Sequence, residues 1–209
     1  MMKTFSLPFG KGTQTVSLDE AHVLYDLHGN PVDAVADEQE AIRQALRHPI
    51  GSAPLKDVVQ AGDTVAIIVS DITRLVHTAQ MLPVIVDELN QAGVRDEQIT
   101  VVTAQGTHRA HRPEEDVIVC GEDMVKRVKV VSHDCRDASQ LTKIGTTTHG
   151  NDVYLDSHVV QADKVILPGA VSFHPMAGFG GGRKAVLPGV ASYETIMRNH
   201  AMALTDTFG

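Results

Sequence analysis

The chain has 209 residues, a formal net charge of −8 and 43% hydrophobic residues, enough apolar mass for one large domain with a core. The negative charge argues against a nucleic-acid partner, which would need a basic face, and two cysteines are too few for a disulfide scaffold or a zinc site. Because there is no apolar run at the start and no window of 18 apolar residues, we expect no signal peptide, no membrane span and a cytoplasmic location.

The sequence predicts short strands first and then alternating strands and helices. The expected strands are residues 3–8, 14–18, 64–69, 99–104, 129–132 and 165–167. The expected helices are residues 37–47, 78–91 and 113–127, with a further helical stretch near the C-terminus. Residues 145–152 are typical of a turn, which leads to a helix or strand near Val159. This alternation predicts an α/β fold, a mostly parallel sheet flanked by helices in a Rossmann-like three-layer arrangement, with a short N-terminal β element.

Polar and ionisable side chains follow each of the last four predicted strands. Because the carboxyl ends of parallel strands gather at one edge of a sheet, we expect these loops to meet there. The loops are residues 70–74, 106–109, 132–134 and 169–184. Taken alone, Asp71 could be a helix cap, and His108 or His133 could be a hydrogen-bonded structural residue. Together, the four loops predict an active site at this edge.

The last of these loops is the most specific. Residues 173–188 are FHPMAGFGGGRKAVLP, which places a histidine, a glycine cluster and Lys184 soon after an apolar strand. Each glycine costs backbone entropy, so a cluster indicates positive φ angles or a ligand held against the backbone. The loop amides and the N-terminus of the helix expected to follow would suit a phosphate or another anion.

Two nucleotide-binding motifs nearly match this loop. A P-loop requires Gly-Lys-Ser/Thr, whereas the glycines here are followed by Arg183-Lys184-Ala185. Residues 180–185 fit the GxGxxA dinucleotide pattern, but they lie well beyond the end of their strand and no acidic residue closes a following strand. A nicotinamide-dependent dehydrogenase is therefore the weaker interpretation.

With these residues assembled, the chain resembles the nickel-pincer lactate racemase family, specifically its N-terminal domain. The matching elements, in the family's order, are Asp71-Ile72-Thr73-Arg74, Gly106-Thr107-His108-Arg109, residues 163–169, His174, residues 178–184, Pro188-Gly189 and Asn199-His200. One departure is Leu75, which stands where the family pattern has proline. Family members carry a further C-terminal domain, so the resemblance implies that residues 1–209 form a single α/β domain and that the C-terminal domain is absent.

The resemblance also implies a cofactor. In that family it is a nickel complex of a pyridinium mononucleotide with two sulfur-bearing arms, nickel-pyridinium-3,5-bisthiocarboxylate mononucleotide. Lys184 is implied to tether one arm covalently, and His200 to supply a nickel ligand, a role that neutral imidazole fills well. The remaining residues implied to bind the cofactor are Asp71, Thr73, Arg74, Gly180, Gly181 and Gly182.

His108 and His174 are the acid/base pair that the resemblance implies. A racemase treats mirror-image substrates alike and needs a base on either face of the reacting carbon, and two histidines can exchange roles near neutral pH. One takes the hydroxyl proton while the α-hydride moves to the cofactor, and the planar 2-keto acid then accepts hydride on either face. Residues 71–74 are implied to contact the cofactor and the small 2-hydroxyacid substrate, with Arg74 offering a bidentate grip on a carboxylate.

The leading hypothesis is therefore an isomerase domain, a 2-hydroxyacid racemase or epimerase, with cofactor-synthesis and insertion proteins and a C-terminal domain as partners. Two alternatives stay open, a non-catalytic module that stores or delivers a nucleotide or metal cofactor, and the dehydrogenase. The dehydrogenase predicts reversible NAD binding that is indifferent to Lys184→Ala, whereas the leading hypothesis predicts loss of a covalent cofactor.

Overall fold

The computed structural model describes residues 1–204, and the chain divides into two compact units, Met1–Ala36 and Asp37–Gly209. The first unit holds the predicted β element, an antiparallel hairpin of β1 (Met2–Phe9) and β2 (Gly12–Asp19), followed by the 3₁₀ helix η1 (Glu20–His22). Its register sets Phe5 opposite Val16 and Thr4 opposite Ser17. Because neighbouring residues of a strand point to opposite faces, the hairpin has one apolar and one hydroxyl-bearing face.

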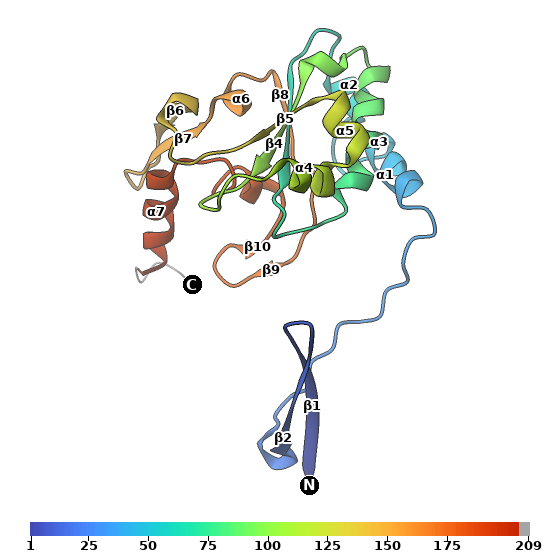
Figure 1. Cartoon of the computed structure of the whole chain (residues 1–209), viewed down its shortest axis with the longest axis vertical. Helices are drawn as coiled ribbons and strands as arrows, with labels where there is room; N and C mark the ends of the chain where they lie inside the picture. Colours follow the sequence, from blue (N-terminus) through green and yellow to red (C-terminus); the bar gives the residue numbers. More distant parts are fainter. Residues whose placement is uncertain (205–209) are drawn as a thin grey trace. The chain divides into compact units, whose positions relative to one another are not determined.

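A four-stranded parallel sheet forms the centre of the second unit (Figure 1). Its spatial order is β5-β4-β3-β8, and the bounds of these strands are β3 (Val65–Ser70), β4 (Ile99–Ala104), β5 (Lys129–Ser132) and β8 (Lys164–Ile166). Val65 lies in register with Ile99 on one side and Lys164 on the other. The predicted α/β fold with a mostly parallel sheet is confirmed.

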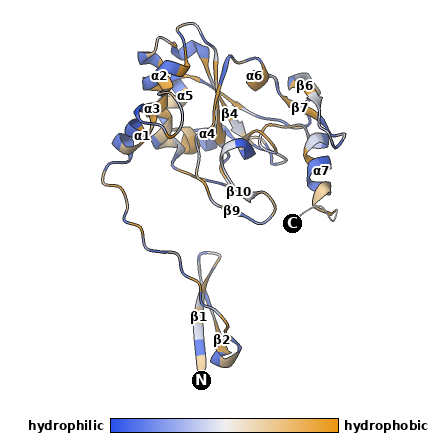
Figure 2. Cartoon of the chain, turned by 180° about the vertical axis from the view of Figure 1, so that it is seen from behind, coloured by the Kyte–Doolittle hydropathy of each residue, from blue (hydrophilic) through white to orange (hydrophobic). Residues whose placement is uncertain are grey.

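Helices cover both faces of this sheet because the side chains of β3 alternate between them. Ile67 packs in a core cluster with Leu82 and other residues of the helices on one face, whereas Ile68 packs with Val159 on the other. The helices of the first face are α1 (Glu38–Arg47), α2 (Leu55–Val58), α3 (Thr78–Gln91), α4 (Pro113–Cys120) and α5 (Glu122–Arg127). Figure 2 shows hydrophilic and hydrophobic residues mixed along α1 and α3, as amphipathic helices require.

The second face is covered by α6 (Ser157–Val160) and by the segment around the 3₁₀ helix η4 (Gly182–Ala185). The last α-helix, α7 (Tyr193–Ala201), packs through Ile196 into a smaller cluster with Leu155. The remaining elements are η2 (Asp96–Gln98), η3 (Ala138–Gln140), the short hairpin of β9 (Phe173–His174) and β10 (Gly178–Phe179), and η5 (Met202–Leu204). Within residues 1–204, no helix has the length and apolar character needed to cross a bilayer.

Two predicted elements differ from the structure. The helix expected over residues 113–127 is split into α4 and α5 at Gly121, whose φ of +91° is not helical. The turn expected near residues 145–152 connects two strands that were not predicted, β6 (Leu141–Thr146) and β7 (Asp152–Asp156), and α6 then contains Val159. β6 is largely exposed and lacks the apolar run that identified the central strands.

The strand order creates a crevice beside β3. The chain moves from β3 to β4 to β5 in one direction and then returns to place β8 on the other side of β3. At such a topological switch point, the loops after the two neighbouring strands leave on opposite faces of the sheet and a ligand can bind between them.

Candidate functional site

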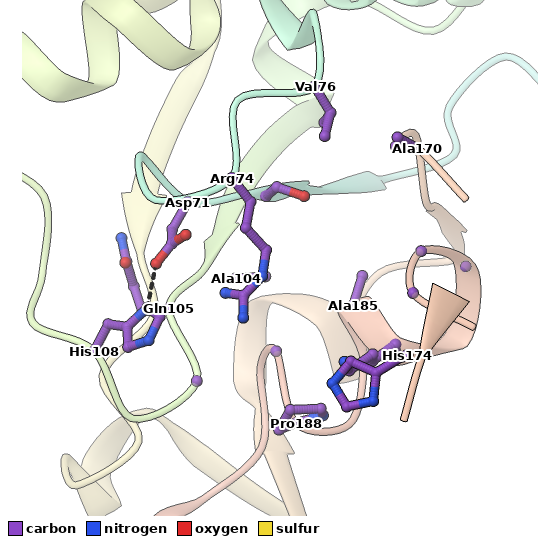
Figure 3. A pocket seen from close by; sticks show the side chains of 18 of the residues that line it. Asp71, Arg74, Val76, Ala104, Gln105, His108, Ala170, His174, Ala185 and Pro188 are labelled. Atoms are coloured by element: carbon purple, nitrogen blue, oxygen red, sulfur yellow. Dashed lines mark hydrogen bonds and ion pairs between the residues drawn. The ribbon is translucent and has the colours of Figure 1, made fainter. Parts of the chain in front are cut away.

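A cavity of about 530 Å³ opens at the carboxyl ends of β3, β4 and β8 (Figure 3). Three of the four predicted loops contribute to it, and α7 adds a fourth wall. The predicted residues on its lining are Asp71, Arg74, His108, His174, Gly180, Gly181, Gly182, Lys184 and His200. The structure thus brings together residues that lie up to 129 positions apart (from 71 to 200) in the sequence.

The fourth loop, after β5, turns away from this cavity. The ring of His133 is buried, with Nδ1 3.0 Å from Asp156 Oδ2 and Nε2 2.9 Å from the carbonyl oxygen of Ala191. Burial acts to raise the pKa of Asp156, but hydrogen bonds from His133 and His158 outweigh it and lower that pKa below its usual value. His133 therefore connects β5, the end of β7 and the segment before α7, a structural role.

Asp71 and His108 form a hydrogen-bonded pair across the ends of β3 and β4. The Asp71 side chain is 2% exposed, and its Oδ2 lies 2.5 Å from His108 Nδ1. Its other oxygen accepts hydrogen bonds from the backbone N–H of Thr73 at 3.1 Å and from the Thr73 hydroxyl at 2.7 Å. Thr73 is not on the cavity lining, and its hydroxyl also accepts a hydrogen bond from Arg74 Nη1 at 3.5 Å. Because a carboxylate only accepts, Nδ1 of His108 carries a proton, and in the neutral ring Nε2 keeps a lone pair.

His174 is held in the opposite way. Its Nδ1 accepts hydrogen bonds from the backbone N–H groups of Met176 at 3.2 Å and Ala177 at 3.1 Å, so the neutral ring carries its proton on Nε2. Desolvation, and then the positive charges of Lys184, Arg74 and His200, lower the pKa of His174 below 6.5. The two imidazoles therefore differ in Nε2, a lone pair on His108 and an N–H on His174.

The cavity is electropositive. In the view of Figure 3, the Arg74 side chain extends between His108 and His174. Lys184, in η4, is half-buried, and desolvation together with the charge of Arg74 lowers its pKa below 10.5. Over the described part of the chain, Asp71 is the one carboxylate on the lining, and both its oxygens are already hydrogen-bonded. Such a cavity is suited to anionic groups such as carboxylate and phosphate.

The glycine-rich loop packs tightly against the segment after β8. The N–H of Gly180 donates to the carbonyl oxygen of Ser172 at 2.7 Å, and a Cβ on Gly181 would lie 2.4 Å from the carbonyl oxygen of Ala170. The loop leads into η4, a 3₁₀ helix of four residues. A dinucleotide motif would lead into a full α-helix whose N-terminus holds the pyrophosphate, so this geometry weakens the dehydrogenase interpretation.

The side chains that could hold a metal are few. His200 Nδ1 donates to the carbonyl oxygen of Ile196 at 2.8 Å, which leaves the lone pair of Nε2 free for a metal. Residues 1–204 contain no group of three or more His, Cys, Asp or Glu side chains that could hold a metal ion. A metal bound by His200 would therefore need its other ligands from a bound group or from outside residues 1–204, and a single imidazole donor is compatible with a pincer complex that brings its own ligands.

One lining residue, Gln105, was not identified from the sequence. It directly follows β4 and is 2% exposed, and its Nε2 donates to Thr103 Oγ1 at 2.9 Å. Its Oε1 is the one buried side-chain polar atom without a hydrogen-bond partner among residues 1–204. Its position after a strand of the sheet indicated a possible site residue. An uncharged amide is also common in ordinary loops, so the residue type did not single it out.

Comparison with known families and proteins gives a consistent match. Residues 9–208 match the family described as the lactate racemase N-terminal domain. The lactate racemase of Lactiplantibacillus plantarum is 36% identical over 206 residues, which cover 96% of this chain and 47% of the relative. The lactate racemase of Thermoanaerobacterium thermosaccharolyticum is 31% identical over 201 residues, which cover 95% of this chain and 47% of the relative. The chain thus spans about half the length of these curated relatives.

Two solved structures resemble the chain. The lactate racemase apoprotein from Thermoanaerobacterium thermosaccharolyticum superposes with a TM-score of 0.84 at 30% identity, covering 95% of this chain and 46% of that one. A protein from Thermotoga maritima superposes with a TM-score of 0.64 at 23% identity, covering 88% and 45% of the two chains, a likeness of fold.

Proposed function

The chain belongs to the lactate racemase N-terminal domain family, as its motifs predicted, and from this premise we propose that it is the cofactor-binding part of a 2-hydroxyacid racemase or epimerase. The main support is the convergence of Lys184, His200, His108, His174 and Arg74 on one cavity at the switch point of the sheet. Since the chain spans about half the length of its curated relatives, we propose that a second domain completes the site for turnover.

Lys184 and His200 are the proposed attachment points of a nickel-pincer nucleotide. The lowered pKa of Lys184 keeps more of its amine neutral at a given pH, which suits a covalent link to a carboxyl-derived arm. The lone pair on His200 Nε2 suits a single protein–nickel bond. The electropositive lining and the glycine-rich loop suit the phosphate of a mononucleotide. When bound, this cofactor would supply a reversible acceptor for the hydride of the substrate's α-carbon.

The chain's own residues would bind the substrate and move its hydroxyl proton. Arg74 would hold the carboxylate of a 2-hydroxy acid by two parallel hydrogen bonds. His108, with a lone pair on Nε2, is arranged to accept the hydroxyl proton, while Asp71 stabilises the imidazolium that forms. His174 is the second imidazole of the site, and its Nε2–H would donate a hydrogen bond to the same substrate oxygen. For the mirror-image substrate His174 would serve as the base, which requires its ring to release the N–H groups of Met176 and Ala177 and to carry its proton on Nδ1.

Intact mass spectrometry of the chain, co-expressed with a cofactor-producing pathway, tests the proposal. We expect a covalent mass adduct and one nickel per chain, both lost in Lys184→Ala. Lys56→Ala is the matched control, because Lys56 lies in α2 away from the cavity lining. Unmodified wild-type protein without nickel, from cells in which a curated relative becomes loaded, would contradict the proposal. Reversible NAD binding that is indifferent to Lys184→Ala would instead support the dehydrogenase.

A further inference from the structure

A buried histidine outside the cavity connects the two loops that carry the site residues after β3 and β4. The side chain of His111 is 1% exposed, and its Nε2 accepts a hydrogen bond from the backbone N–H of Ile72 at 2.9 Å. Its Nδ1 lies 2.9 Å from Asp116 Oδ1 in α4. The backbone N–H of His111 donates to Ser132 Oγ at 3.2 Å, so the residue is also held from β5.

These partners allow only one proton arrangement. An imidazole nitrogen accepts a hydrogen bond only when it carries no proton, so the contact with the Ile72 N–H requires a bare Nε2. The single proton of the neutral ring is then on Nδ1 and is donated to the Asp116 carboxylate. His111 is therefore held as a neutral imidazole in a fixed tautomer. Asp116 in α4 is the charged residue bound to the ring, and Asp71 and Arg74 lie on either side of Ile72 in the loop that His111 holds.

The Ile72 peptide, which His111 binds, lies next to residues with proposed roles in the reaction. Ile72 directly follows Asp71, the hydrogen-bond partner of His108, and Arg74 lies two residues further on. His111 itself lies three residues after His108. The Ile72–His111 bond therefore fixes one loop relative to the other at the point where Asp71 meets His108.

We propose that His111 is a positioning residue of the site, which holds the Ile72 peptide and thereby directs Asp71 toward His108 and Arg74 into the cavity. The inference rests on the proposed function for the roles of Asp71, His108 and Arg74. Loss of the Ile72 contact releases a loop whose displacement by about 1 Å would cost on the order of 100-fold in rate.

Two substitutions at His111 test its bond to Ile72 separately from its bond to Asp116. The amide end of Gln reaches the place of Nε2, so His111→Gln keeps an acceptor for the Ile72 N–H and loses the bond to Asp116. The shorter Asn reaches the place of Nδ1, so His111→Asn keeps the bond to Asp116 and loses the acceptor for Ile72. A general structural role predicts similar defects in both variants, whereas the positioning role predicts a defect in His111→Asn that His111→Gln relieves.

The first readout needs neither cofactor nor turnover. NMR of the imidazole ¹⁵N nuclei in the wild-type chain should show His111 with a bare Nε2, and the His108 Nδ1 proton bound to Asp71 should give a protected low-field resonance. That resonance should be lost or broadened in His111→Asn and kept in His111→Gln. A protonated Nε2 on wild-type His111, or an unchanged His108 resonance in folded His111→Asn, would overturn the inference.

The second readout is racemisation by the cofactor-loaded protein with its second domain. We expect kcat to fall by about 10- to 100-fold in His111→Asn, with KM rising less, and by under about threefold in His111→Gln. Equal losses in the two variants would overturn the positioning role. Failure of the proposed function is distinguishable, because an absent Lys184 adduct leaves the NMR result on His108 and Asp71 intact.

Discussion

The carboxylate of Asp71 and the imidazole of His108 meet at 2.5 Å across the ends of two adjacent parallel strands, with the carboxylate buried and the ring exposed. The pairing fixes the tautomer of the neutral ring, because a buried, hydrogen-bonded carboxylate holds the proton of Nδ1 and leaves Nε2 bare as a base.

Asp71→Asn should reverse that tautomer. The Asn amide can donate to Nδ1, which would place the ring proton on Nε2 and remove the base from the cavity. We expect racemisation by the loaded protein to fall by about 10³- to 10⁴-fold with little change in stability. Asp134→Asn is the control, since this exposed carboxylate follows β5 and its one hydrogen bond within residues 1–204 is from the N–H of Arg136. A loss of under tenfold in Asp71→Asn would contradict the assigned role.

Lys184 should react with acylating reagents at lower pH than an ordinary lysine. Its pKa is lowered by desolvation and by Arg74, so a larger fraction of the amine is neutral at any given pH below 10.5. Arg74→Gln removes the repulsion, raises this pKa and should slow acylation below that pH, whereas Arg183→Gln should not. Trace acetylation followed by peptide mass spectrometry, as a function of pH, measures the rate at each lysine. An identical pH profile in wild type and Arg74→Gln would refute the electrostatic cause.

Gly181→Ala should destabilise the chain more than Gly182→Ala. Gly181 has φ +75° and ψ −175°, a region nearly restricted to glycine, and an added Cβ would lie 2.4 Å from the carbonyl oxygen of Ala170. A Cβ on Gly182 meets nothing within 4 Å. We expect the free energy of unfolding to fall by about 2–4 kcal/mol for Gly181→Ala and by about 1 kcal/mol for Gly182→Ala, measured by chemical denaturation. Equal losses would show that the loop relaxes around the added methyl group.

Asp156 should contribute stability that is lost in acid. Its folded-state pKa is below the unfolded value of 3.8. The stability that Asp156 contributes is therefore complete well above pH 3.8 and disappears as the pH falls through the lower, folded-state pKa. Asp156→Asn should flatten the acid limb of stability and lower the free energy of unfolding at neutral pH by about 3 kcal/mol, because it leaves buried His133 without its carboxylate. Asp57→Asn, an exposed control in α2, should leave the acid limb unchanged.

The central sheet could be predicted because its strands are short apolar runs between turn residues. The residues of β3 from Val65 to Val69 are all buried, and the apolar spacing of α3 matches its observed bounds of 78 and 91. The β6–β7 hairpin could not be predicted in the same way. Its pairing depends on contacts of β7 with α7, such as the Tyr154 N–H bound to Thr195 Oγ1, 41 residues away.

The candidate site was predictable to the level of loops but not of every side chain. Parallel strands place the loops that follow them at one edge of the sheet. This rule predicted that the loops of His108 and Lys184 meet, and both residues line one cavity. The same argument could not separate His108 from His133, since both follow strands. The difference lies in tertiary partners, an exposed ring beside Asp71 against a buried ring beside Asp156. Thr73 was predicted to bind cofactor, and the structure adds a contact that spacing did not reveal, its hydrogen bond to Asp71.

The crowding of positive charge around Arg74 has a thermodynamic consequence for ligand binding. Desolvation, and then repulsion by neighbouring cations, lower the pKa values of His174 and Lys184. An anion entering the cavity offsets that repulsion and raises both pKa values, so each group takes up protons on anion binding where the pH is near its pKa. Calorimetric heats of anion binding will therefore depend on the ionisation enthalpy of the buffer, and affinity will rise as pH is lowered toward the pKa of His174. Proton uptake and anion capture are two measurements of one coupled equilibrium.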